Sequence, residues 1–284
     1  MVVFFALTSA FFIGLSNVLI RKGLDRGSRI QAIVFSLLSS VAIFWTLVFL
    51  FGNIALLVTF AIAWFLLAGL LGPGIGRALS ITSLERIGLA RTIPIVGIAP
   101  FFAVIVAIGI LGESFSFLIF LGMAVIIFGI FLLSKDNIEK KLFKKRDIFL
   151  PLGSALFGGF SIAITKRGLQ DLTDPLIAAT LVGTMALLVV LSYAIWSGKI
   201  LELRTSSFSS IKFPLLAGAS LSTAFLLNFN ALSYGEISIV APIMSTFPLF
   251  GVLLSFVFLK EKITEGMWLG IIFILAGISF IQFL

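Results

Sequence analysis

The chain has 284 residues, of which 60% are hydrophobic and only 11% are charged, and its net charge is +8. Soluble domains are about 25% charged, so this composition excludes an ordinary water-soluble protein and indicates one that lies in a membrane. Cysteine and histidine are both absent. Their absence excludes disulfides, thiolate metal sites, cysteine nucleophiles and the commonest metal ligand and general base.

Ten apolar runs are long enough to cross a bilayer, because a membrane-spanning helix needs about 20 mainly apolar residues. In chain order the predicted spans are Val2–Ile20, Ile30–Phe51, Leu56–Leu84, Gly88–Leu111, Phe115–Leu133, Ile148–Thr165, Pro175–Trp196, Phe213–Leu232, Ile237–Leu259 and Thr264–Phe283. The first run lacks the basic segment that begins a cleavable signal peptide, so we expect a retained helix. The predicted fold is therefore an all-α integral membrane protein with ten transmembrane helices.

The two halves of the chain repeat one another. Leu84, Pro94, Pro100, Glu113, Gly122 and Gly129 recur as Leu232, Pro242, Pro248, Glu261, Gly270 and Gly277, all at an offset of 148 residues. Ser9, Gly14, Ser16 and Gly23 recur as Ser154, Gly159, Ser161 and Gly168, at an offset of 145. Each half holds five spans, an odd number, so the second half enters the membrane in the opposite sense. This predicts inverted-topology repeats, which are typical of secondary transporters.

The division we predict is a first repeat at 1–134, a basic connector at 135–147 and a second repeat at 148–284. Of the 20 Lys and Arg residues, 17 lie in the odd-numbered loops and only Lys166 and Arg167 lie in the even-numbered ones. Basic residues favour the cytoplasmic side. The charge distribution therefore predicts a cytoplasmic connector and two termini on the opposite side. Between apolar runs these basic loops are topology signals beside anionic lipid, so we expect no nucleic acid partner.

Polar residues inside the spans are the candidate binding residues, because a polar group in a span is costly unless protein or a water-filled cavity surrounds it. Ser9, Ser16 and Asn17 share a face of the first span, and Ser154, Ser161 and Thr165 share a face of the sixth. Because Ser9 and Ser16 are equivalent to Ser154 and Ser161, this predicts matching stripes that line one cavity. The alternative is that each serine bonds within its own helix or packs against a neighbour.

Arg77 is the sharpest single candidate, because it is a full charge well inside the third span. A central Arg costs about 2.5–3.5 kcal/mol on insertion scales, so something must compensate it. Pro73 frees the Gly69 carbonyl, and the nearby glycines loosen the same turn. A substrate carboxylate or phosphate is one compensating partner. The alternative is that Arg77 reaches a membrane interface.

The eighth span adds Asn228, which is equivalent to Ser80, and Asn230. The two amides can bond a substrate or join helices. Five prolines inside spans are candidate kinks or hinges, or else static bends. They are Pro73, Pro94, Pro100, Pro242 and Pro248. Glu113 and Glu261 follow the fourth and ninth spans, where we expect each to cap or pair with the start of the following helix.

Catalytic and nucleotide-binding motifs are missing from the sequence. It contains no HExxH, no GxSxG, no pair of intramembrane acids and no Walker A loop. We therefore predict that the chain is not an enzyme, needs no metal or other cofactor, and is not driven directly by ATP.

Two pairs of segments resemble an EamA domain. LGESFSFLIFLGMAVIIFGIFLL and LKEKITEGMWLGIIFILAGISFI are similar to its end, and ARTIPIVGIAPFFAVIVAIGIL and SIVAPIMSTFPLFGVLLSFVFL are similar to its fourth helix. The resemblance covers nearly the whole chain in two copies and implies the drug/metabolite transporter superfamily. It implies a central cavity walled by helices one to four and six to nine, and peripheral helices five and ten. In several members both termini are cytosolic, opposite to the charge count here.

These observations predict a secondary transporter that moves a small polar or amphipathic metabolite, such as an amino acid, across the membrane by alternating access. Its partners would be the substrate and the bilayer, and we expect a monomer. The predicted binding residues are Ser16, Asn17, Arg77, Ser80, Ser161, Asn228 and Asn230. The alternatives are an exporter of lipophilic drugs, with Arg77 structural, and a lipid-handling protein or flippase.

Overall fold

A computed structural model describes residues 1–25, 27–53, 55–56, 59–114, 116–135, 144–204, 208–260 and 262–282. Within these ranges every regular element is helical. The elements are α1 (Val2–Leu24), α2 (Arg29–Phe51), α3 (Ala61–Gly69), η2 (Leu70–Gly76), α4 (Arg77–Arg86), α5 (Leu89–Val96), α6 (Ala99–Val106), η3 (Ala107–Leu111), α7 (Phe117–Lys135), η4 (Lys145–Ile148), α8 (Phe149–Asp171), α9 (Pro175–Trp196), α10 (Ile200–Arg204), α11 (Phe208–Tyr234), α12 (Ile237–Met244), α13 (Phe247–Leu259) and α14 (Glu265–Gln282). Of these, η2 and η3 are π-helical and η4 is a 3₁₀ turn.

The ten predicted spans are all present as helices. In the described part of the chain, nine stretches are long and apolar enough to cross a membrane, and α14 supplies a shorter apolar helix over Glu265–Ile281. The third, fourth and ninth spans are each built from more than one element. The all-α, ten-helix membrane fold is therefore confirmed, and the chain is a multi-pass membrane protein.

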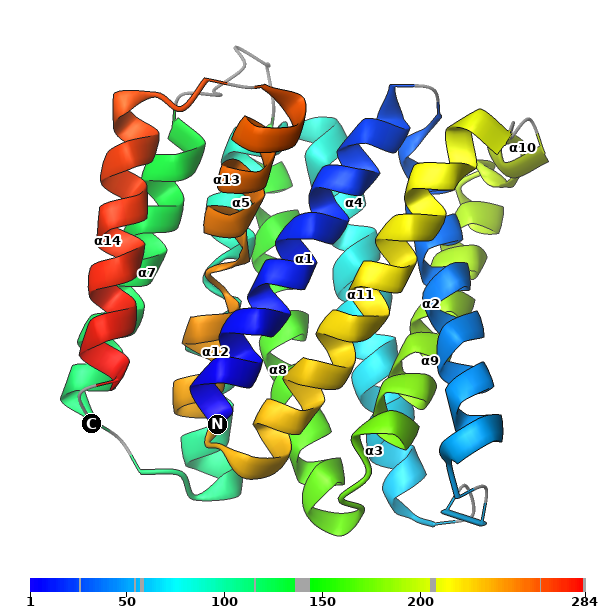
Figure 1. Cartoon of the computed structure of the whole chain (residues 1–284), viewed down its shortest axis with the longest axis horizontal. Helices are drawn as coiled ribbons and strands as arrows, with labels where there is room; N and C mark the ends of the chain where they lie inside the picture. The colour runs from blue at the N-terminus through cyan, green and yellow to red at the C-terminus, as the bar shows by residue number, and fades with distance from the viewer. Residues whose placement is uncertain are drawn as a thin grey trace.

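The two ends of the helical bundle are distinguished by the helix termini that lie at each (Figure 1). We call the end where α1 begins and α14 ends the terminal face, and the end where α7 ends and α8 begins the connector face. Hydrogen bonds cap helix starts at both ends. Ser28 and Gln31 form a reciprocal capping box at the start of α2, and Asp174 accepts from the N–H groups of Leu176 and Ile177 at the start of α9.

Each half of the bundle mixes helices from both repeats. In what we call the α1 group, α1 packs along α11 and against α12 and α13, and α2 packs along α11. In the α8 group, α8 packs along α3, η2 and α4 and against α5 and α6, and α9 packs against α3 and η2. The contact between α1 and α11 is thus the repeat equivalent of the contact between α8 and α3–η2–α4. This exchange is what two inverted repeats around one axis produce.

Glycines at repeat-equivalent positions show the same symmetry at atomic scale. A Cβ added to Gly14 would lie 2.8 Å from the Cβ of Phe250, and one added to Gly159 would lie 2.6 Å from the Cβ of Phe102. Phe102 and Phe250 are themselves equivalent, 148 residues apart. The backbone of α1 therefore touches α13 in the same way that the backbone of α8 touches α6, and any side chain at either glycine would separate the helices.

Helices α7 and α14 form an antiparallel pair at the edge of the bundle (Figure 1). A Cβ on Gly122 would lie 2.9 Å from the carbonyl oxygen of Gly277, and one on Gly129 would lie 2.8 Å from that of Gly270. These four glycines, which recur between the two repeats, therefore meet one another across this interface, where close backbone approach replaces side-chain packing.

Prolines flank a break in the helix of two equivalent spans. The fourth span breaks between α5 and α6, and Pro94 and Pro100 flank the break; the ninth breaks between α12 and α13, with Pro242 and Pro248 in the same places. Matching backbone bonds cross both breaks: Ile98 N–H donates to Ile95, and Thr246 N–H donates to Ile243. The breaks are therefore equivalent parts of the two repeats, as loss of the proline N–H predicts.

The cytoplasmic placement of the connector face remains a prediction, and cysteine labelling tests it cleanly because the chain has no native cysteine. Lys144 and Gln170 are exposed at opposite ends of the bundle. In intact cells we expect an impermeant thiol reagent to label Gln170→Cys and to leave Lys144→Cys unlabelled until the membrane is permeabilised. Labelling of only Lys144→Cys from outside would reverse the orientation.

Candidate functional site

The serine stripes join the helices of each group. Ser9 Oγ donates to the Ala224 carbonyl at 2.8 Å, and Ser16 Oγ donates to Ala217 at 2.9 Å, so both tie α1 to α11. In the other group Ser161 Oγ donates to the Ala68 carbonyl of α3 at 2.8 Å. All three hydroxyls are buried. In this conformation each hydroxyl donates to a carbonyl of a neighbouring helix, which is the helix-packing alternative given above.

Asn17 lies on a different face of α1 from Ser9 and Ser16. It follows Ala6, Ala10 and Ile13 at the spacing of one helical face. Ala6 and Ala10 are 0% exposed, Ile13 is partly buried, and Asn17 is exposed. The buried alanines show that this face is turned toward the protein interior, whereas Phe4, on the opposite face, is 66% exposed. On the interior face of α1, exposure therefore rises from the buried alanines near the terminal face to Asn17 nearer the connector face.

Arg77 begins α4, directly after the π-helix that contains Pro73. The Arg77 N–H donates to the carbonyl of Gly72, five residues earlier, as expected of a π turn. Gly72 and Gly76 face α8, and Gly74 faces α9. One turn after Arg77, Ile81 is buried in a cluster with residues of α2, α9 and α11. These directions leave Arg77 on the side of the third span that is turned toward the bundle interior.

The repeat-equivalent residue of Arg77 also lies on the interior side of its helix. Phe225, the equivalent of Arg77 on α11, packs against both buried hydrophobic clusters. The Arg77 side chain is half-buried. Among the residues that the structure describes, no carboxylate lies within ion-pair distance of it and no group hydrogen bonds to its guanidinium. The described residues therefore supply no partner for this charge inside a span.

The two asparagines of α11 point in different directions. Asn228 is 5% exposed, and its buried Oδ1 atom has no hydrogen-bond partner among the residues that the structure describes. Asn230 is partly buried and donates to the Leu226 carbonyl of its own helix at 2.7 Å. It lies on the stripe of Thr223 and Tyr234, which are exposed. Ser80, the equivalent of Asn228, is half-buried one turn after Arg77. Ser80 and Asn228 therefore occupy equivalent positions in the two repeats, and Arg77 lies one turn before Ser80. Asn230 lies on the exposed stripe instead.

Lys166 and Glu113 make contacts that sequence analysis did not assign. Lys166 Nζ, near the end of α8, donates to the carbonyls of Leu232 at 2.5 Å and Gly235 at 2.9 Å. Glu113 accepts from the N–H groups of Ile237 at 2.8 Å and Ser238 at 3.0 Å. Glu113 thus caps α12 of the other repeat, not the following helix α7 as expected. Its counterpart Glu261 lies outside the described residues.

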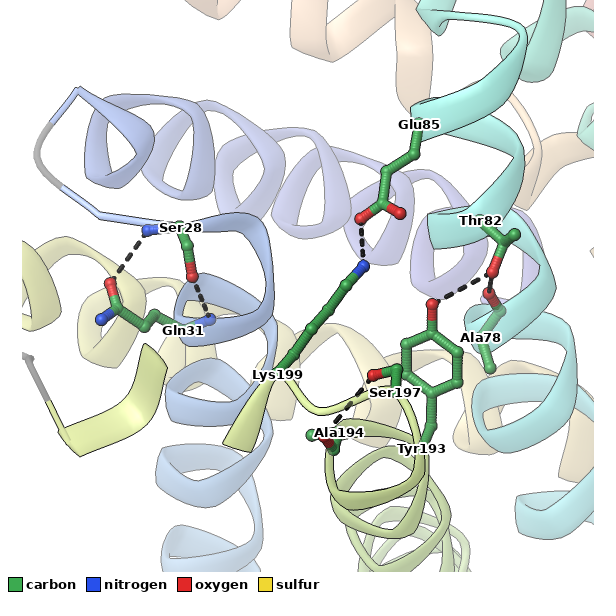
Figure 2. Close-up of polar contacts among 9 residues, drawn as sticks. All are labelled: Ser28, Gln31, Ala78, Thr82, Glu85, Tyr193, Ala194, Ser197 and Lys199. Carbon is green, nitrogen blue, oxygen red and sulfur yellow. Dashed lines mark hydrogen bonds and ion pairs between the residues drawn. The ribbon is translucent and has the colours of Figure 1, made fainter. Parts of the chain in front are cut away.

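A second polar cluster lies at the connector face (Figure 2). Lys199 Nζ donates to Glu85 Oε1 at 2.6 Å, and the Thr82 and Tyr193 hydroxyls lie 3.1 Å apart. Burial opposes the charge on Lys199, but the hydrogen bond to Glu85 and the neighbouring Tyr193 outweigh it and raise the pKa of the ammonium. The Lys199 ammonium therefore remains charged at neutral pH, and its bond to Glu85 ties the end of α4 to the loop after α9, both within the α8 group.

No group of three or more acidic, His or Cys residues that could hold a metal ion occurs in the described ranges. The model of the EamA-like transporter family matches residues 1–135 and 145–283. A crystal structure of another protein has the same fold, with a TM-score of 0.80 at 13% sequence identity, over 98% of this chain and 95% of that one. At this identity the likeness concerns the fold alone. No curated protein matches the sequence.

Proposed function

Because the chain belongs to the EamA-like transporter family, we propose that it is a secondary transporter for a small polar or amphipathic metabolite with a carboxylate or phosphate. Transport proceeds by alternating access, in which the α1 group and the α8 group rock about a site near the bilayer midplane. Each group contains helices of both repeats, and the two groups contact one another through α2 with α9 and α12 with α6.

The observation that carries this proposal is the unpaired guanidinium of Arg77. A buried charge needs a partner, and the described residues offer none. The planar guanidinium matches a carboxylate or phosphate with two parallel hydrogen bonds, which a point charge does not. A substrate anion is the partner that also explains why the second repeat has Phe225 at the equivalent position, since one charged end needs only one cation.

The remaining inward groups fit the rest of such a substrate. Asn17 offers an exposed amide on the interior face of α1, and Ser80 offers a hydroxyl one turn from Arg77. Asn228 has an acceptor oxygen without a partner, which a donor group on the substrate would satisfy when the helices rearrange. Ser16 and Ser161 hold helices together in this conformation and contribute by fixing α1 and α8 beside the path.

A thermal-shift screen of the purified protein tests the substrate class. Amino acids, nucleosides, sugar phosphates and cationic lipophilic drugs are compared, because a ligand that binds the folded state stabilises it by mass action. We expect stabilisation by compounds that carry a carboxylate or phosphate, and loss of that stabilisation in Arg77→Ala. Stabilisation only by lipophilic cations, unchanged in Arg77→Ala, would favour a drug exporter instead.

Transport should not require ATP hydrolysis, because the sequence holds no Walker A loop. We expect counterflow of the stabilising ligand in proteoliposomes at the same rate with and without ATP. Vesicles without protein supply the background rate. Counterflow that occurs only with hydrolysable ATP would contradict secondary transport, because it would require a partner that hydrolyses ATP.

A further inference from the structure

The terminal face is held shut by four hydrogen bonds that cross from one helix group to the other. Lys166, in the α8 group, donates to Leu232 and Gly235 at the end of α11. Glu113, which follows η3 in the α8 group, accepts from Ile237 and Ser238 at the start of α12. Both α11 and α12 belong to the α1 group. We call these contacts the terminal clasp.

Each charge of the terminal clasp lies against a helix end of the α1 group. The Lys166 ammonium meets two carbonyl oxygens at a helix C-terminus, and the Glu113 carboxylate meets two N–H groups at a helix N-terminus. Each charge therefore faces the helix end whose dipole it complements. Such contacts are stable when the groups are closed at this face and are lost when the groups separate.

The connector face differs at the equivalent positions. Lys166 is equivalent to Arg21 at the offset of 145 residues, so both faces carry a basic residue at this position. Asn17 is equivalent to Ile162 at the same offset. Asn17 is exposed, whereas Ile162 is partly buried and packs against the main hydrophobic cluster. In a conformation closed equally at both faces, inverted repeats would give Asn17 and Ile162 the same exposure. Their different exposure therefore indicates a conformation that is open toward the connector face.

We propose that the terminal clasp of Lys166 and Glu113 is the gate that closes the terminal face, and that its release opens the path there. This inference rests on the proposed alternating access but not on the substrate. The ion pair of Lys199 and Glu85 has no such role, because it joins α4 to the segment after α9 within one group. Its contact persists when the groups rock, which makes Lys199 a matched control for Lys166.

Twin cysteine probes in the cysteine-free chain test the gate. Asn17→Cys and Ile162→Cys sit at equivalent depths near the two ends of the path, and a small thiol-reactive dye is timed on purified protein in detergent, without ligand. In the native background we expect Asn17→Cys to react about tenfold faster or more. Lys166→Met should raise the rate at Ile162→Cys and lower it at Asn17→Cys, because it shifts the population toward the state open at the terminal face.

Two further variants decide between a gate and a general loss of structure. Lys199→Met should change neither probe's rate. Glu113→Gln keeps the shape of the side chain and removes its charge, so it should act in the same direction as Lys166→Met even if that variant folds poorly. Unchanged labelling of Ile162→Cys in folded Lys166→Met and Glu113→Gln would overturn the gate. Equal effects of Lys166→Met and Lys199→Met would also overturn it. Loss of anion binding in Arg77→Ala leaves these rates untouched, so the two proposals fail separately.

Discussion

Replacing Arg77 by alanine should abolish transport of the carboxylate- or phosphate-bearing substrate while the protein still folds. The guanidinium has no protein partner among the described residues, so its removal costs no internal ion pair and relieves the burial of a charge. The substrate anion, however, loses a pair of charge-assisted hydrogen bonds. Such bonds are each worth about 1.5–3 kcal/mol, so loss of the pair should lower the affinity by about a hundredfold or more.

Arg77→Lys separates charge from geometry at the same position. Lysine keeps the positive charge but loses the planar fork, so we expect an affinity between those of the native protein and Arg77→Ala. Arg29→Ala is the matched control, because it removes the same charge from an exposed position at the start of α2. Dissociation constants and proteoliposome counterflow are measured for all three. Normal transport by Arg77→Ala would contradict the proposal that Arg77 binds the substrate anion, and would favour an exporter of lipophilic drugs.

Hydropathy and the repeated landmarks were sufficient to predict the spans, because each span must satisfy its backbone within one apolar helix whatever its neighbours are. Span ends were less well predicted. The third span begins at Ala61 and not Leu56, since Asn53 first turns the chain by accepting from the Ala55 N–H. Helix α1 continues past Ile20 to Leu24, with Arg21 and Lys22 in its last turn, where positive charge stabilises the helix end.

The candidate site was only partly accessible from the sequence. Residues two apart on a helix lie on different faces, so the spacing of Asn228 and Asn230 already argued against a shared pocket. The partner of Glu113 could not be found locally, because it is a helix start more than a hundred residues away. Lys166 had a usable signal: it is the repeat equivalent of Arg21, so a basic residue recurs at the same place on the two faces. The depth at which Arg77 sits depends on how two groups pack, which no single span specifies.

The close contact of α1 with α13 and of α8 with α6 predicts the largest effect on folding. Gly159→Val should strongly reduce the yield and thermal stability of folded protein, and Gly14→Val should do the same. A Cβ at Gly159 would lie 2.7 Å from the backbone nitrogen of Ala103, and one at Gly14 would lie 2.9 Å from that of Gly251. Backbone atoms cannot rotate away as a side chain can, so two packed helices must separate along their length.

The expected cost of overpacking at one such glycine is about 1–3 kcal/mol, with more for a β-branched residue against backbone. Gly251→Ala is the matched control, because a Cβ there meets nothing within 4 Å although the residue lies in α13 itself. Alanine also favours a helix more than glycine does, so this variant should be neutral or slightly stabilising. Thermal unfolding of the purified variants, followed by size-exclusion chromatography, measures the difference. If Gly14→Val and Gly159→Val unfolded at the same temperature as Gly251→Ala, the two equivalent backbone contacts would not hold the helix groups together.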